Sequence, residues 1–147
     1  MSYRIVSPPE APALAELMRA YYAFDGHDFD EPRVRCTLAD FLNSPDHGRA
    51  WFIEADGVVA GYMVICFGYS LSFGGRDAFV DEIYLHEPFR GRGLGRDALT
   101  FMIAEAERLG IKALHLEVNE HNVPAQRLYS SLGFQRGRFR LMSRPIS

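Results

Sequence analysis

The stretch FRGRGLGRDALTFMIAEAERLG, residues Phe89 to Gly110, places three glycines at alternate positions among three arginines, directly before a helical pattern. Gly91, Gly93 and Gly95 leave the backbone free to adopt positive φ and to bring its N–H groups against a ligand. The helix that follows adds the positive end of its dipole and its unpaired N–H groups at the same place. The stretch therefore predicts a turn that binds a phosphate-bearing ligand.

Composition sets the broad class. The chain has 147 residues, of which 48% are hydrophobic and 24% charged, as expected of one compact domain over residues 1–147. A net charge of −3 argues against a nucleic-acid partner. The most apolar run, Val58 to Tyr69, is too short to span a membrane, and the N-terminus lacks a signal-peptide pattern. We expect a cytoplasmic protein with no membrane attachment.

The two cysteines give no sign of a metal site or a disulfide framework. Cys36 and Cys66 are far apart and belong to no CxxC or Cys/His pattern. We expect both to be buried free thiols, and we expect no bound metal.

Hydrophobic periodicity along the rest of the chain predicts alternating strands and helices. The expected strands are Tyr3 to Val6, Trp51 to Ala55, Val58 to Tyr69, Ala78 to Leu85 and Ala113 to Val118, with a closing hairpin from Phe134 to Met142. The expected helices are one beginning near Ser7, with Ser7 as its cap, one from Val34 to Leu42, the helix ending at Gly110, and one from Pro124 to Leu132. Asp56-Gly57 predicts a tight hairpin turn between two of the strands.

Two common nucleotide-binding motifs do not fit the glycine-rich turn. A dinucleotide fingerprint, GxGxxG, follows the first strand of its unit, whereas several expected strands precede Gly91 and the spacing differs. A P-loop, GxxxxGK followed by Ser or Thr, is absent. The simplest alternative is a glycine-rich turn with solvated arginines.

Two motifs resemble those of the GNAT superfamily of N-acetyltransferases. Arg90-x-x-Gly93-x-Gly95 is similar to the family's acetyl-CoA signature, R/Q-x-x-G-x-G/A, and NEHNVPAQRLYSSLGF, from Asn119 to Phe134, is similar to its N-x-x-A-x-x-L-Y-x-x-x-G-F segment. The resemblance is close from Phe79 to Phe134 and loose elsewhere. It implies an α/β (α+β) fold: a single domain with a central mixed, mostly antiparallel, splayed β-sheet flanked by helices.

The resemblance also implies a co-substrate, acetyl-CoA, and residues that bind it. In the family, the pyrophosphate lies on the backbone of the turn, the pantetheine arm pairs with the preceding strand, and one asparagine contacts the pantetheine or a water. The matching residues are Arg90, Gly91, Arg92, Gly93, Leu94, Gly95 and Arg96 in the turn, Ile83, Tyr84 and Leu85 in the strand, and Asn122.

Acetyl transfer to an amine requires a base for the amine proton and an acid for the departing thiolate. Tyr129 matches the tyrosine that donates to the coenzyme sulfur in many family members; the alternative is a core tyrosine. Asp81 and Glu82 interrupt an apolar strand and are candidate bases. Strict strand alternation would let only one of the two face the cleft, and a solvated pair on an edge strand is the alternative.

The acceptor is the least determined part of the site. Asp28, Asp30 and Tyr22 lie in or beside an acidic loop that would border the acceptor cleft, which favours a small cationic primary amine, and a loose similarity to polyamine-type acetyltransferases agrees. If Arg136, Arg138 and Arg140 face the cleft instead, an anionic group on the acceptor fits better. A peptide or protein N-acetyltransferase and a non-catalytic acyl-CoA sensor are further alternatives. A homodimer is common in the fold, but no pattern here indicates its interface.

Overall fold

The computed structural model describes residues 1–146, which form two compact units, Met1–Glu117 and the residues from Val118 on. Each unit is described by itself. The first contains β1 (Ser2–Ile5), the 3-10 helix η1 (Pro8–Glu10), α1 (Ala11–Asp25), α2 (Glu31–Asn43), β2 (Gly48–Ala55), β3 (Val58–Ser70), β4 (Gly75–Leu85), the 3-10 helix η2 (Glu87–Phe89), α3 (Leu94–Arg108) and β5 (Leu114–His115). The second contains α4 (Val123–Ser131).

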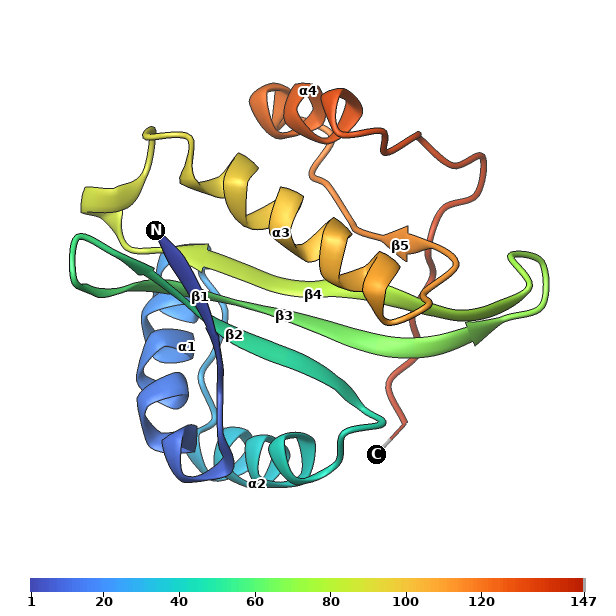
Figure 1. Ribbon diagram of the computed structural model, residues 1–147. Coiled ribbons are helices and arrows are strands. Elements are labelled where there is room, and N and C mark those ends of the chain that lie inside the picture. Colours follow the sequence, from blue (N-terminus) through green and yellow to red (C-terminus); the bar gives the residue numbers. More distant parts are fainter. Residues whose placement is uncertain (147) are drawn as a thin grey trace. The chain divides into compact units, whose positions relative to one another are not determined.

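The five strands form one sheet in the order β1-β2-β3-β4-β5. All neighbouring pairs are antiparallel except β4 and β5, which are parallel. Helices α1 and α2 cover one face of this sheet and α3 covers the other (Figure 1). The prediction of a mixed, mostly antiparallel sheet flanked by helices is confirmed.

Strand alternation divides the core between the two faces. Ala50 and Phe52 of β2 pack toward α1 and α2, whereas Trp51 and Ile53 pack toward α3. Both faces of β2 are buried because helices lie on both sides, which explains its continuous apolar run. The β2–β3 turn at Asp56-Gly57 has positive φ at both residues, 54° and 78°, so the predicted tight hairpin is confirmed.

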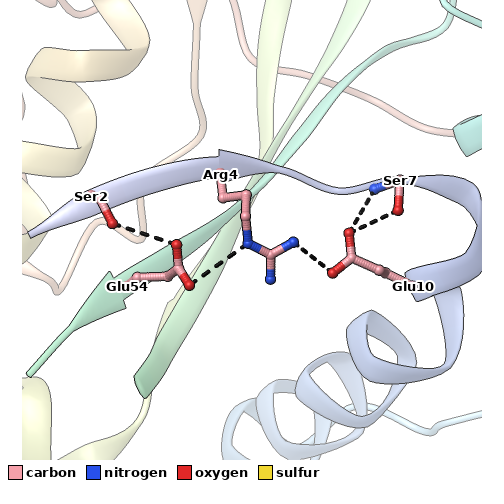
Figure 2. A network of polar contacts seen from close by, with 5 residues as sticks. All are labelled: Ser2, Arg4, Ser7, Glu10 and Glu54. Atoms are coloured by element: carbon pink, nitrogen blue, oxygen red, sulfur yellow. Dashed lines mark hydrogen bonds and ion pairs between the residues drawn. The ribbon is translucent and has the colours of Figure 1, made fainter. Parts of the chain in front are cut away.

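A polar network anchors β1 to its neighbours and starts α1 (Figure 2). The backbone N–H and the hydroxyl of Ser7 both donate to Glu10, at 3.1 Å and 2.8 Å. Arg4 donates to the other oxygen of Glu10 at 2.6 Å, and its Nε lies 3.6 Å from Glu54, which also accepts from Ser2. The predicted cap at Ser7 is confirmed, and the helix it begins is first a 3-10 turn.

The sheet opens between β4 and β5. Only Ala78 and Phe79 of β4 pair with β5, so β4 from Val80 to Leu85 has no strand partner on that side among residues 1–146. The strand predicted from Ala113 to Val118 is therefore too long. It ends at His115 because the two strands diverge and no ladder of hydrogen bonds extends it. This divergence is the splay that the family resemblance implies.

In the second unit, Asn122 caps α4 by accepting from the N–H of Ala125 at 3.1 Å, as predicted. The closing hairpin predicted from Phe134 to Met142 is wrong, because no residue of that segment is in a strand. Two of its three alternating arginines contact other residues of the same unit. Arg136 donates to Gln126 at 3.2 Å, and Arg140 lies 3.6 Å from Glu120.

The two cysteines are free thiols, but the prediction that both are buried is wrong: Cys36 is exposed and Cys66 is only half-buried. Helix α2 turns Val34 and Leu38 to the core, and Cys36, two residues from each, lies off that face. None of the helices within residues 1–146 is both long and apolar enough to span a bilayer.

Candidate active site

A β-bulge determines which way the two candidate carboxylates point. Val64 of β3 pairs with Glu82, but the next residue, Ile65, pairs with Val80, so β4 contains one extra residue, Asp81. Two residues of a bulged strand oppose one residue of its partner, and here Asp81 and Glu82 together oppose Val64. The bulge therefore interrupts the strict alternation of side chains along β4 on which the expectation rests, and it places Glu82 on the same face as Val64.

Packing on both sides of the bulge shows the change of register. Before it, Ala78 and Val80 pack toward α3, and after it Ile83 does so, while Tyr84 packs toward α1. Even-numbered side chains of β4 therefore face α3 before the bulge and α1 after it. Without the extra residue, Glu82 would point toward α3.

The carboxylate of Glu82 lies between two tyrosines. The hydroxyl of Tyr62, on β3, donates to Oε1 at 2.6 Å, and the hydroxyl of Tyr22, on α1, donates to Oε2 at 2.7 Å. Burial raises the pKa of Glu82 above its usual value, the two hydroxyls oppose that rise, and the charge of Asp81 adds to it. Burial and the hydrogen bond to Glu82 raise the pKa of both tyrosines, so both remain neutral donors.

Asp81 lies beside this cluster. Its charge acts on Tyr22, Cys66 and Glu82. Its side chain is exposed, yet desolvation by the surrounding protein, followed by the charge of Glu117, raises its pKa. Two adjacent carboxylates with raised pKa values give a site that favours a cation and can hold a proton.

The glycine-rich turn has the backbone that the sequence predicts. Gly91 and Gly93 have φ of 73° and 77°, in the left-handed region, and Gly93 is the N-cap of α3 without any side-chain cap. The helical ladder begins with Asp97 N–H donating to Gly93 at 3.2 Å, so the N–H groups of Leu94 and Gly95 have no partner within the helix. Among residues 1–146, apart from chain neighbours and the nearby backbone of α3 itself, no atom lies within 4 Å of a Cβ added at any of the three glycines. The turn thus exposes backbone donors beside open space, as a pyrophosphate site requires.

Arg90 and Arg92 of the turn contact α1, β4 and the β2–β3 turn. Arg90 lies over the rings of Phe24 and Tyr84, with its guanidinium carbon 4.0 Å and 5.5 Å from their centroids. Arg92 forms an ion pair with Asp56. The positive charge of the turn is therefore shared with α1 and with the β2–β3 turn.

The open edge of β4 presents backbone groups for an extended ligand. The carbonyl of Leu85 accepts from Arg90 Nε at 2.8 Å, whereas the N–H of His86 donates to Ala60 of β3 at 2.8 Å. Because backbone groups along a strand point to alternate edges, Ile83 and Leu85 face away from β3. Both belong to the set that the resemblance assigns to the pantetheine arm.

The acidic loop between α1 and α2 lies next to Tyr22. The N–H of His27 donates to the carbonyl of Tyr22 at 2.8 Å, and the Tyr22 ring packs edge-on against Phe29 with centroids 5.8 Å apart. Asp30 is the N-cap of α2 and accepts from the backbone N–H of Arg33 at 3.2 Å. Asp28 is exposed. The loop and the Glu82 cluster are therefore joined through one tyrosine.

Tyr129 belongs to α4 in the second unit. Its ring packs edge-on against Phe134 with centroids 6.1 Å apart, and burial raises its pKa. Among residues 1–146, none hydrogen-bonds to its hydroxyl, and no group of three or more His, Cys, Asp or Glu side chains is placed to hold a metal ion. Because burial raises its pKa, the hydroxyl of Tyr129 stays protonated and neutral at pH 7.

Comparison with known proteins decides the family. The model of the Acetyltransferase (GNAT) family matches residues 12–134. The chain belongs to the GNAT acetyltransferase family. This GNAT chain is 39% identical over 82 residues to an L-methionine sulfoximine/L-methionine sulfone acetyltransferase of Salmonella typhimurium, covering 55% of the chain and 47% of that protein. It is 31% identical over 107 residues to a thialysine N-epsilon-acetyltransferase of Bos taurus, covering 72% and 58%. The chain spans about half the length of these curated relatives.

Solved structures share the fold over almost the whole chain. An integron cassette protein from the mobile metagenome of Cole Harbour Salt Marsh superposes with a TM-score of 0.87 at 28% identity, covering 99% of this chain and 90% of that one. A predicted acetyltransferase from Clostridium acetobutylicum, solved with acetyl-CoA, gives a TM-score of 0.80 at 17% identity, covering 97% and 95%.

Tyr62 is the residue of the Glu82 cluster that sequence reasoning missed. It stands in the apolar run of β3, where a tyrosine is indistinguishable from a core residue, and its side chain is 0% exposed. One signal was available: a buried tyrosine hydroxyl needs a partner, and the neighbouring strand contains two carboxylates.

Proposed function

We propose that this GNAT chain is an acetyl-CoA-dependent N-acetyltransferase that acts on the primary amine of a small cation. The observation that carries the proposal is the carboxylate of Glu82, which lies on β4 where the sheet opens and is held by Tyr22 and Tyr62. A non-catalytic acyl-CoA sensor has no need for a half-buried, hydrogen-bonded carboxylate at this position.

Glu82 is the proposed base. An alkyl amine has a pKa of about 10.4, so nearly all of it is protonated at neutral pH and must lose a proton before it can attack. A carboxylate accepts that proton more effectively when its pKa rises toward the working pH, and burial raises the pKa of Glu82. Asp81, next to it at the bulge, adds negative charge that attracts the ammonium form.

The turn and the edge of β4 are the proposed coenzyme site. Acetyl-CoA supplies the acetyl group as an activated thioester. Backbone N–H groups at Leu94 and Gly95 and the open space at Gly93 fit its pyrophosphate, and the backbone of Ile83 and Leu85 fits the pantetheine arm. The other residues of the set named above, Asn122 included, belong to the same proposal.

Tyr129 is the proposed acid. A cysteine-like thiol has a pKa of about 8.5, so its thiolate gains from a nearby hydroxyl donor as it departs. The hydroxyl of Tyr129 is not engaged by any of residues 1–146, and its raised pKa keeps it protonated at neutral pH.

The proposed acceptor is a small primary amine of the amino-acid or polyamine kind. The names of two relatives refer to amino acids and their analogues, methionine sulfoximine, methionine sulfone and thialysine. Asp28 and Asp30, on the loop that Tyr22 anchors, add negative charge to the side from which the acceptor would come. Peptides are the competing acceptors.

A coenzyme A release assay over an amine panel tests this function. The panel contains spermidine, L-lysine, L-ornithine, L-methionine sulfone, an aminoglycoside and a peptide with a free N-terminal amine. We expect turnover with at least one small amine, a loss of about one hundredfold in Glu82→Gln, and no change in Glu107→Gln on the far side of α3. Turnover of the peptide alone would refute the small-amine assignment. Coenzyme binding without turnover of any acceptor would point to a sensor.

A cytoplasmic location and a homodimer complete the proposal. Tyr69 and Leu71, at the tip of the β3–β4 hairpin, are 75% and 90% exposed, and a homodimer that formed there would cover both. Light scattering across a dilution series measures the oligomeric state; a constant monomer mass would contradict the dimer.

A further inference from the structure

The carboxylate of Glu82 is fixed from two separate elements. Tyr62 of β3 holds Oε1 and Tyr22 of α1 holds Oε2, each through a short hydrogen bond of 2.6 Å and 2.7 Å. A carboxylate has about four lone-pair positions, so this arrangement occupies one on each oxygen and leaves one on each oxygen for a reacting proton. Both donors are phenols, which bind the charged carboxylate without neutralising it.

Tyr62 is a rigid support. Its side chain is 0% exposed, and its ring packs against Tyr21 and Tyr84, with centroids 6.4 Å and 6.2 Å apart. A buried hydroxyl without a partner is unfavourable, so Tyr62 and the carboxylate hold each other in one geometry.

Tyr22 makes a second connection that Tyr62 lacks. Its ring lies edge-on to His27 and Phe29, with centroids 6.1 Å and 5.8 Å apart, and its carbonyl accepts the N–H of His27 at 2.8 Å. The segment from Gly26 to Asp30, which we propose as a wall of the acceptor site, is therefore packed on the same residue that holds Glu82.

We infer that Tyr62 and Tyr22 are positioning residues for the base Glu82, and that Tyr22 also couples the base to the loop that receives the acceptor. The inference rests on the proposed role of Glu82 as base. It assigns different consequences to the two hydroxyls: Tyr62 acts on proton acceptance alone, whereas Tyr22 acts on proton acceptance and on acceptor binding.

Several charged or titratable groups face this carboxylate, and the test must separate them. They are Tyr22 from α1, His27 from the following loop, Tyr62 and Cys66 from β3, and Asp81 from β4, with Glu117 acting on Asp81. The two tyrosine hydroxyls are hydrogen-bonded to Glu82 and lower its pKa. Removing either one must therefore raise the pKa of the carboxyl, a result that a purely structural role does not produce.

Carbon-13 NMR of the glutamate side-chain carboxyls measures this directly in the whole protein without any substrate. Glu82→Gln assigns the signal, and Tyr3→Phe, which removes a hydroxyl on the opposite face of the sheet, is the matched control. We expect the midpoint of Glu82 to rise by about one pH unit in Tyr62→Phe and in Tyr22→Phe and to stay in place in Tyr3→Phe. Unchanged midpoints in both variants would overturn the inference.

Kinetics with the best amine of the panel above separates the two roles. A higher pKa alone would make Glu82 a stronger base, but we expect the loss of its fixed geometry to outweigh this effect. Tyr62→Phe should therefore lower kcat about tenfold with the acceptor KM unchanged, and Tyr22→Phe should lower kcat and raise the acceptor KM. In both, the acid limb of kcat/KM should move to higher pH. If Tyr62→Phe does not fold, Tyr22→Phe still tests both the titration midpoint of Glu82 and the acid limb of kcat/KM, because Tyr22 is less buried than Tyr62. Full activity of Glu82→Gln would refute the role of Glu82 as the base. If Glu82→Gln is inactive but the acid limb of kcat/KM stays in place in both tyrosine variants, only the positioning role of the tyrosines is refuted.

Discussion

Arg92 and Asp56 form a two-contact ion pair: Nη1 lies 2.8 Å from Oδ2 and Nη2 lies 3.3 Å from Oδ1. The pair joins the glycine-rich turn to the β2–β3 hairpin, 36 residues away in the chain. Asp56 also places a negative charge beside the proposed pyrophosphate site, and this charge opposes the binding of an anion.

Asp56→Asn should therefore strengthen coenzyme A binding. Asparagine accepts the positive φ of this position, 54°, so the hairpin keeps its shape while the charge is removed and Arg92 is released. We expect an affinity about two- to fivefold higher by calorimetry at low salt, and a smaller difference at about 0.5 M salt. Weaker binding in this variant would show that the ion pair organises the turn.

Gly93 and Gly95 offer a test that separates backbone strain from ligand contact. Gly93 has φ of 77°, so Gly93→Ala strains the free protein, whereas Gly95 lies within the first turn of α3 and a Cβ there meets no atom within 4 Å. Gly95→Ala should stabilise the free protein by up to about 1 kcal/mol. If the pyrophosphate approaches this backbone, both variants should bind coenzyme A about tenfold more weakly. Unchanged affinity in Gly95→Ala, measured by calorimetry beside its melting temperature, would exclude close approach at that position.

The sequence predicted the order of elements well up to β4, because hairpin and capping signals there are local. Ser7 with Glu10 and Asp56 with Gly57 specify their turns within four residues. The segment after Phe134 shows the opposite case. Its alternating pattern fits a hairpin, but strand formation depends on a partner ladder, and pattern alone does not supply one.

The candidate site divides in the same way. The turn from Arg90 to Arg96 could be proposed from the sequence because its motif is contiguous. The direction of Glu82 could not, since the bulge that turns it toward α1 is a property of how β4 pairs with β3. Tyr62 was missed for a related reason: its role comes from a contact between two strands, and only the paired register brings its hydroxyl to Glu82.

Tyr129→Phe should lower kcat by about one hundredfold with little change in the affinity for acetyl-CoA. The substitution removes one hydroxyl and retains the packing of the ring against Phe134. Tyr69→Phe, which removes an exposed hydroxyl from the β3–β4 hairpin, is the control. Steady-state kinetics and a melting curve measure both effects. Full turnover together with a lower melting temperature would make Tyr129 a core residue and leave the acid unassigned.

Glu10 should make stability depend on pH in the acid range. The hydrogen bond from Arg4, followed by those from Ser7, lowers the pKa of Glu10 from its ordinary value of 4.5 to about 2. Because the pKa of Glu10 is lower in the folded protein than in the unfolded chain, its ionised carboxylate stabilises the fold at pH values above 4.5. This stabilisation is lost as the pH falls from 4.5 toward 2. Glu10→Gln should melt below wild type at pH 6, and the difference should shrink over that range. A constant difference down to pH 2, with Glu107→Gln as control, would contradict the assignment.

The charge of the acceptor can be tested on the loop that Tyr22 anchors. Asp28 and Asp30 both lie on this loop, and together with Asp81 and Glu82 they would give the proposed acceptor site a negative field. Asp30→Asn keeps the cap of α2, because asparagine caps helices as well as aspartate does. The double variant Asp28→Asn/Asp30→Asn should raise the KM of a cationic amine several-fold, at about 0.5–2 kcal/mol for each charge, and leave acetyl-CoA binding unchanged. The effect should diminish with added salt.

Asp46→Asn, on the exposed turn between α2 and β2, is the matched control. A neutral or anionic acceptor that the double variant uses as well as wild type does would contradict the cationic assignment, and the arginines from Arg136 to Arg140 would then be the residues to substitute.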